Sequence, residues 1–264
     1  MSDSRLDTVF TRLRADGRTA LIPYLTAGYP SPAASLEALR ATAEHADVIE
    51  VGVPFSDPLA DGPTIQRSTF DALHQGMTLP RTLELVERAA LARPVVIFSY
   101  LNPILRYGVD RFLADAAELG IAGLLLTDLP AGSDAAIEGA VQRSPLDLVR
   151  LIAPTTRAER LAQAVQGAEG FVYLVARLGV TGASTALAQD LPQSIARVRQ
   201  ATPLPVAAGF GISTPAQARA VAGLADGVVV GSALVDVLGR HGVAAAAAFL
   251  RGLREAVDAA EPVR

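Results

Sequence analysis

Residues 95–127 read VVIFSYLNPILRYGVDRFLADAAELGIAGLLLT and contain one full repeat of a pattern that runs through the chain. Two short apolar runs, Val95–Tyr100 and Ile121–Thr127, flank the amphipathic segment Arg111–Leu119. Apolar runs of this length are typical of buried strands, and apolar residues at helical spacing predict a helix. A strand, a helix and a second strand in this order predict a βαβ unit with parallel strands.

The same alternation extends over the whole chain. Further strands are expected at Thr19–Leu25, Val48–Val53, Asp147–Ile152, Phe171–Val175, Leu204–Ala208 and Gly227–Val230. Further helices are expected at Leu6–Ala15, Pro32–His45, Leu79–Ala92, Arg157–Gln166, Leu191–Ala201, Pro215–Ala222 and Gly242–Ala260. The interval between the second and third strands is the longest and has room for two helices.

Eight strand–helix units predict an α/β fold, a single-domain (β/α)8 TIM barrel over residues 1–264 with an extra N-terminal helix. A doubly wound open sheet is the alternative. That fold usually has fewer strands, and no G-x-G-x-x-G sequence follows the first strand here.

Composition excludes several kinds of chemistry. The 23 basic residues are all arginine, and the 264 residues include no lysine, no cysteine and only three histidines. The chain therefore offers no Schiff-base lysine, no thiolate nucleophile and no cysteine zinc site. None of the histidines, His45, His74 and His241, lies at a strand end, so no metal site is expected.

Charge and hydropathy favour a soluble protein. A net charge of −4 without clustered arginines gives no footprint for nucleic acid. The apolar runs are far shorter than the roughly 20 residues that span a membrane, and Met1–Arg14 is too polar for a secretory signal. We therefore expect a cytoplasmic protein that binds a small molecule, with neither nucleic acid nor a membrane as partner.

Carboxylates gather where a barrel would have its active site, in the second strand and the loop after it. Glu50 interrupts the apolar run Val48–Val53, and burying a carboxylate there is costly unless it is paired or functional. It is either a structural glutamate tied to an arginine or to backbone amides, or a general acid/base. Asp57 and Asp61 follow in the stiff loop Pro54–Pro63, where either could instead brace its own turn.

Glycine-rich sequences follow the sixth, seventh and eighth strands, at Gly179–Gly182, Gly209–Ser213 and Gly231–Ala233. Many barrels bind phosphate after the last two strands, because glycine lets the backbone and a helix N-terminus approach an anion. A phosphate site is therefore favoured over simple tight turns.

Three tyrosines are candidate ligand contacts. Tyr24 and Tyr100, with Asn102, lie near strand ends and could line a pocket for an aromatic ligand. Tyr173 shares one face of the sixth strand with Phe171, and it is either a pocket residue or a core tyrosine with a satisfied hydroxyl.

The sequence Glu50–Gln66, EVGVPFSDPLADGPTIQ, resembles the signature of the tryptophan synthase α subunit family. The resemblance covers essentially the whole chain and includes, in family order, Pro23–Pro30, Tyr100–Pro103, Thr127–Pro130 and the three glycine-rich sequences. It implies a lyase of tryptophan biosynthesis that cleaves indole-3-glycerol phosphate to indole and glyceraldehyde 3-phosphate by retro-aldol chemistry.

The resemblance also implies roles for individual residues. Glu50 would shuttle a proton between the substrate hydroxyl and the indole ring carbon, and Asp61 would accept the indole N–H. Substrate contacts would come from Tyr24, Tyr100, Tyr173 and Thr181, and phosphate contacts from Gly182, Gly211, Gly231 and Ser232. The stretch Thr181–Asp190 would form a lid over the substrate.

Finally, the resemblance implies a partner and no cofactor in this chain. A β subunit that carries pyridoxal phosphate would receive the indole in an α2β2 heterotetramer, contacting the Pro54–Gly62 loop and the region after Asn102. One alternative is a stand-alone indole-3-glycerol phosphate lyase that releases free indole. Another is a catalytically weak barrel that acts as an allosteric partner.

Overall fold

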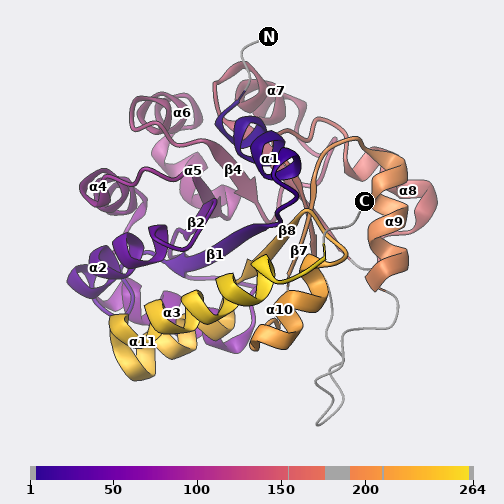
Figure 1. Cartoon of the computed structure of the whole chain (residues 1–264). Helices are drawn as coiled ribbons and strands as arrows, with labels where there is room; N and C mark the ends of the chain where they lie inside the picture. Colours follow the sequence, from indigo (N-terminus) through magenta and orange to yellow (C-terminus); the bar gives the residue numbers. More distant parts are fainter. Residues whose placement is uncertain (1–3, 154, 176–190, 210, 262–264) are drawn as a thin grey trace.

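Eight parallel strands close into a barrel, which the computed structural model describes for residues 4–153, 155–175, 191–209 and 211–261 (Figure 1). The strands are β1 (Ala20–Thr26), β2 (Ile49–Gly52), β3 (Val95–Ser99), β4 (Gly123–Leu126), β5 (Asp147–Ile152), β6 (Val172–Val175), β7 (Val206–Gly209) and β8 (Gly227–Val230). Each pairs with the next, and β8 pairs with β1 to close the sheet. The predicted barrel is confirmed, and β5 and β8 have both of their predicted boundaries.

Helices surround the barrel, as Figure 1 shows. They are α1 (Arg5–Ala15), α2 (Pro32–Ala43), α3 (Pro63–His74), α4 (Leu79–Ala89), α5 (Leu101–Tyr107), α6 (Val109–Glu118), α7 (Ala135–Arg143), α8 (Ala158–Ala164), α9 (Leu191–Ala201), α10 (Pro215–Ala222) and α11 (Ser232–Asp258). The hydroxyls of Ser31 and Thr214 cap α2 and α10, and a proline follows each cap. A hydroxyl cap before proline satisfies a free backbone N–H, which explains why both helices begin at the predicted residue.

Three features of the helices differ from the sequence prediction. The pattern does not predict α5 or α7; Pro103 makes α5 resemble a loop, yet it lies in the first turn, where a missing N–H costs little. The final helix is longer than predicted, because α11 begins at Ser232, and the predicted start at Gly242 is the point where two helical segments join. Gly242 has φ +79° and ψ −177° and forms a kink inside the longer helix.

Helix α11 is long and apolar enough, by length and composition alone, to cross a membrane. Its contacts are those of a barrel helix, because it packs against α10, α2 and β1. Leu234, Leu238, Leu250 and Leu253 on this helix are buried in the outer core. The kink at Gly242 divides the helix into two segments, and each segment has buried leucines.

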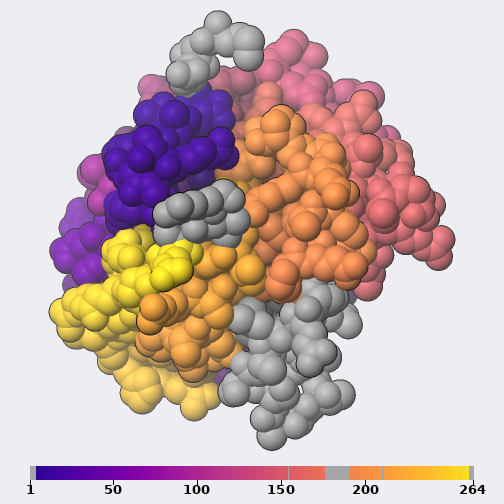
Figure 2. Space-filling view, turned by 45° about the vertical axis from the view of Figure 1, so that its right-hand side comes forward, coloured from indigo at the N-terminus to yellow at the C-terminus, as the bar shows by residue number. Residues whose placement is uncertain are grey.

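Alternate residues of each strand fill the barrel interior, together with side chains from α1. The interior cluster contains Leu6, Val9, Phe10, Leu13, Ala20, Ile22, Val48, Val96, Ala122, Leu125, Val149, Phe171, Tyr173, Ala207 and Val229. The ring of Phe10 lies 5.4 Å from that of Phe171, so α1 closes the N-terminal end of the barrel. Figure 2 shows α1 in indigo at this end, beside orange segments of the second half of the chain.

The other strand residues point outward and pack under the helices. Ile49 and Val51 of β2 belong to this outer core, whereas Val48 belongs to the interior. Because side chains alternate along a strand, Glu50 points into the barrel. Its neighbour on β1 is Tyr24, which is in register with it.

A buried carboxyl ties α1 to the strands. The hydroxyl of Ser4 caps α1 by accepting the N–H of Asp7, and it donates to Asp147 Oδ2 at 2.6 Å. Asp147, at the start of β5, is 7% exposed. Burial raises the pKa of Asp147 to about 6, and the nearby Asp7 and Glu169 contribute in the same direction.

We expect Asp147→Asn to stabilise the protein above pH 6, by up to about 3 kcal/mol. The unfolded carboxyl ionises near its ordinary pKa of 3.8 and the folded one near 6, so wild-type stability falls as pH rises between these values. Asparagine cannot ionise, and its oxygen still accepts the Ser4 hydroxyl. Urea unfolding at pH 4, 6 and 8 checks this; a difference that does not shrink toward pH 4 would contradict it.

Candidate active site

Glu50 is the central residue of the C-terminal half of the barrel. It is 1% exposed, and neither carboxyl oxygen has a hydrogen-bond partner among the described residues. Burial raises the pKa of Glu50 to about 8. The tie to an arginine or to backbone amides that a structural role would require is therefore not seen in the described part of the chain. A carboxyl with this pKa can exchange a proton near neutral pH.

Two buried tyrosines lie beside Glu50. Burial raises the pKa of Tyr173, and the charges of Glu50 and Tyr24 add to this effect. Burial likewise raises the pKa of Tyr24, with Asp61 and Glu50 as further causes. Gly52 makes this arrangement possible, because a Cβ at that position would lie 2.0 Å from the Tyr24 hydroxyl oxygen. Both phenols therefore stay neutral and can act only as hydrogen-bonding or packing groups.

Asp61 reaches the site from the loop between β2 and α3. Its Oδ2 accepts a hydrogen bond from the hydroxyl of Tyr100, the residue that directly follows β3, at 3.1 Å. The carboxylate therefore bonds outside its own loop and does not brace its own turn. Burial raises the pKa of Asp61 to about 6, against the opposing effect of the Tyr100 hydrogen bond. The loop backbone is fixed separately, since Gln66 Nε2 donates to the carbonyl of Asp61 at 2.9 Å. Asp57, in contrast, is exposed and accepts the Ser56 hydroxyl.

An apolar wall adjoins these polar groups. Tyr24, Ile65 and Val235 form a cluster against which Tyr29 and Phe98 pack. The rings of Tyr24 and Phe98 meet edge to face, with centroids 5.3 Å apart. Phe98 was not among the candidates predicted from the sequence. It lies on β3, two residues before Tyr100, and this spacing is a signal that could have identified it. Such a wall beside a few polar groups suits a flat aromatic ligand.

The glycine-rich strand ends lie close to this wall. Gly211 has φ +77°, and a Cβ at Gly209 would lie 2.5 Å from the carbonyl oxygen of Val229. Gly231 caps α11, whose first residue is Ser232. Added to Gly231, a Cβ would lie 3.5 Å from the Cβ of Tyr24, so the start of α11 adjoins the tyrosine. Two further candidates, Thr181 and Gly182, and the expected lid Thr181–Asp190 lie outside the described residues.

The surface outside Asp61 is unusually apolar. Leu59 on the same loop is 92% exposed, and Phe70 on α3 and Leu105 on α5 are 61% and 49% exposed. A groove of about 800 Å³ runs along Phe55, Leu59 and Phe70. A second, of about 470 Å³, lies between the loop and α5. Exposed apolar side chains around grooves are typical of a protein–protein interface.

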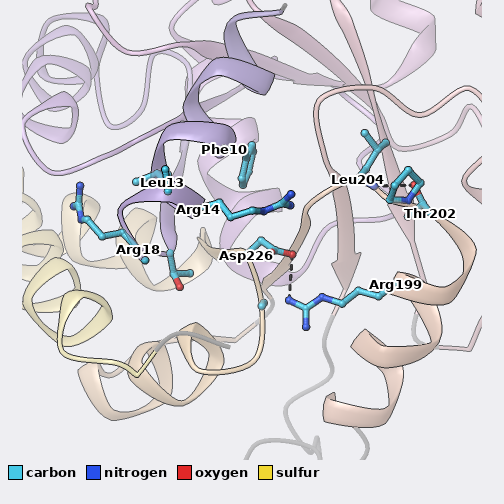
Figure 3. Close-up of a pocket in the computed structure, with 13 residues that line it drawn as sticks. Phe10, Leu13, Arg14, Arg18, Arg199, Thr202, Leu204 and Asp226 are labelled. Atoms are coloured by element: carbon cyan, nitrogen blue, oxygen red, sulfur yellow. Dashed lines mark hydrogen bonds and ion pairs between the residues drawn. The ribbon is translucent and has the colours of Figure 1, made fainter. Parts of the chain in front are cut away.

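The opposite end of the barrel has a groove of a different character. It measures about 750 Å³ and lies between α1 and the segment from α9 to β8 (Figure 3). On one side of it Arg199 pairs with Asp226 at 3.2 Å, and Arg18 pairs with Asp258 at 3.2 Å. Two of its arginines are thus held in ion pairs. The acid/base candidates all lie at the other end, where barrel enzymes have their active sites.

The described residues contain no group of three or more His, Asp or Glu side chains that could hold a metal ion. The chemistry of the described site therefore comes from two carboxyls, three phenols and backbone amides at glycines. The two carboxyls have different environments, since Glu50 is buried without a donor and Asp61 accepts one hydrogen bond.

Residues 10–259 match the family model described as tryptophan synthase alpha chain. The chain belongs to this family. Members are lyases that act on indole-3-glycerol phosphate, and this chain is such a carbon–carbon lyase of tryptophan biosynthesis, which cleaves that substrate to indole and glyceraldehyde 3-phosphate. The expected family and activity are therefore confirmed.

Solved structures agree with the family assignment. A chain of Mycobacterium tuberculosis tryptophan synthase has 42% sequence identity and a TM-score of 0.90, with 97% of this chain and 99% of that chain covered. Tryptophan synthase subunit alpha from Legionella pneumophila has 35% identity and a TM-score of 0.87, with 97% and 98% covered. A protein from Aquifex aeolicus has 34% identity and a TM-score of 0.86, with 96% and 98% covered.

Proposed function

We propose that Glu50 and Asp61 carry out the cleavage of indole-3-glycerol phosphate. The observation that carries this proposal is the Glu50 carboxyl, buried in the barrel without a hydrogen-bond partner among the described residues. A group that is costly to bury and forms no structural contact there is expected to serve the reaction.

The different pKa values of the two carboxyls suit two different roles. With a pKa of about 8, Glu50 is mostly protonated at pH 7 and can protonate the indole ring carbon that carries the side chain. The resulting Glu50 carboxylate then takes the proton of the adjacent side-chain hydroxyl. The carbon–carbon bond breaks, its electron pair returns to the ring, and the hydroxyl-bearing carbon becomes the aldehyde.

Asp61 stabilises the intermediate in this scheme. Its pKa of about 6 leaves it ionised at pH 7. A carboxylate that accepts the indole N–H opposes the positive charge on the protonated ring, which is stabilisation aimed at the transition state. The protonated ring itself is the electron sink, so the scheme needs neither a lysine nor a metal.

The remaining candidate residues would position the substrate. Tyr24, Tyr100 and Tyr173, with Thr181, would line the indole and glycerol portions. The phosphate would bind at the backbone of Gly182, Gly211 and Gly231 and at the Ser232 hydroxyl. The start of α11 supports this placement, because a helix N-terminus offers free amides and a favourable dipole to an anion.

The partner would be a tryptophan synthase β subunit that carries pyridoxal phosphate, in an α2β2 heterotetramer in the cytoplasm. The similar solved structures include Mycobacterium tuberculosis tryptophan synthase, one of them in an aminoacrylate-bound form. The exposed apolar side chains of Leu59 and Leu105 support an interface on the Pro54–Gly62 loop and α5. An indole-release assay with and without a β subunit tests this. A rate that does not rise on adding any β subunit would favour the stand-alone lyase.

We expect Glu50→Gln to abolish cleavage, with at least a 1,000-fold loss of kcat, about 4 kcal/mol of transition-state stabilisation. Glutamine keeps the shape of the side chain but can neither give nor take a proton. Circular dichroism and phosphate-ligand binding should match the wild type. Near-wild-type indole release by Glu50→Gln would overturn the mechanism.

Asp61→Asn should lower kcat about 100-fold and change the pH profile. Wild-type kcat/KM should be bell-shaped, because Asp61 loses its charge below about pH 6 and Glu50 loses its proton above about pH 8. The amide does not ionise in this range, so the variant should lose the acidic limb and keep the basic one. A variant that retains both limbs would assign the acidic limb to another group.

Ser232→Ala should raise KM several-fold and lower kcat less, because a phosphate contact is present in both ground state and transition state. Steady-state kinetics of indole release measure both constants. Ser213→Ala is the matched control on the preceding strand's loop, where the hydroxyl bonds to Gln217. An unchanged KM in Ser232→Ala would move the phosphate site elsewhere.

A further inference from the structure

Tyr100 contacts the Pro54–Gly62 loop at three points. Its ring lies 5.1 Å from the ring of Phe55, with 35° between the two planes. Its hydroxyl accepts the backbone N–H of Ala60 at 2.8 Å and donates to Asp61 Oδ2 at 3.1 Å. A single side chain thus holds the ring, the backbone and the carboxylate of one loop.

The backbone of Tyr100 is held by residues outside the loop. It directly follows β3 and is 6% exposed. The hydroxyl of Ser99 donates to the carbonyl oxygen of Tyr100 at 2.8 Å. The next backbone N–H, that of Leu101, donates to Asp128 Oδ1 at 2.7 Å, from the segment after β4. The backbone at Tyr100 is therefore held from outside the loop, by the neighbouring residue of β3 and by the segment after β4.

We propose that Tyr100 is a positioning residue, whose hydroxyl fixes Asp61 by one carboxylate oxygen and leaves the other for the substrate N–H. This rests on the proposed function, in which Asp61 accepts that N–H. Among the described residues, Asp61 Oδ1 has no hydrogen-bond partner, whereas Oδ2 is occupied by Tyr100. The role differs from a direct contact with the indole ring, because Tyr100 acts through Asp61.

The hydrogen bond also favours the ionised form of Asp61. Burial raises the pKa of Asp61, and the bond from Tyr100 opposes that rise. The other titratable groups around it do not supply this effect. Tyr24, on β1, is neutral, Glu50, on β2, is mostly protonated at pH 7, and Asp57, on the same loop, is exposed. Without the hydroxyl, more of Asp61 would be protonated at neutral pH, and the carboxylate would be free to rotate.

The test uses Tyr100→Phe, which keeps the ring against Phe55 and removes only the hydroxyl. The probes are indole and benzofuran, two ligands of similar shape of which only indole has an N–H. The dissociation constant of benzofuran divided by that of indole, measured on the purified chain from pH 5 to 8, reports the bond between the N–H and ionised Asp61. In the wild type this ratio should rise with pH, with a midpoint near the Asp61 pKa of about 6.

In Tyr100→Phe, the midpoint should move up by about one pH unit and kcat for indole release should fall about tenfold. Tyr100→Leu, which also lacks the hydroxyl, should show the same midpoint and keeps the test available if the first variant folds poorly. Ser4→Ala is the matched control, because it removes a 2.6 Å hydroxyl–carboxylate bond to Asp147 at the other end of the barrel. It should lower the melting temperature and leave the midpoint unchanged.

The outcomes separate this inference from the proposed function. An unchanged midpoint in Tyr100→Phe overturns the positioning role, even if kcat falls, because a merely structural role lowers activity without moving the ionisation of Asp61. A wild-type ratio near one at every pH overturns the role of Asp61 itself, and with it the proposed mechanism. A ratio that is flat in Asp61→Asn and shifted in Tyr100→Phe supports both.

Discussion

The constraint on which the site depends is the burial of an ionisable carboxyl inside a closed parallel barrel. Every second residue of β2 points inward, and one of these residues is Glu50. Its carboxyl is removed from solvent and has no hydrogen-bond donor in the described chain. The barrel tolerates it because the group can stay protonated, at a pKa of about 8. The surroundings suit this neutral form. Gly52 leaves space for the Tyr24 hydroxyl, and Tyr24 packs in the apolar cluster with Ile65 and Val235.

The two carboxyls show how one fold gives two acidic side chains different environments. Glu50 belongs to a strand, so its environment is fixed by the sheet: the position is buried and lies beside Tyr24 and Tyr173. Asp61 belongs to a loop, so its environment has to be supplied by a neighbour, and Tyr100 supplies it from β3. The loop that carries Asp61 also carries Leu59, the most exposed of the large apolar side chains. The proposed chemistry and the proposed partner surface thus share the Pro54–Gly62 loop.

Much of this arrangement can be predicted from the sequence. Buried parallel strands are continuous apolar runs, so all eight were predicted within about two residues of their ends. Glu50 was a candidate because a carboxyl interrupts such a run, whereas the role proposed for Asp61 came only from the family resemblance. The start of α11 and helices α5 and α7 were missed, since glycine and proline there resemble loop residues. Phe98, Ile65 and Val235 were missed because only the closed register brings them together. The hydroxyl of Tyr100 binds a residue far away in sequence, and no local spacing predicts such a bond.

Helix α1, which precedes the first strand, affects how substrate can reach Glu50. Phe10 and Leu13 of α1 belong to the interior cluster, and the ring of Phe10 packs against that of Phe171. Side chains therefore fill the N-terminal end of the barrel. In the part of the chain that the structure describes, α1 fills the N-terminal end, so we expect substrate to reach Glu50 from the C-terminal end of the barrel. The exposed apolar side chains of Leu59 and Leu105 lie on the loop and helix that follow β2 and β3, so a partner bound there would lie near that end.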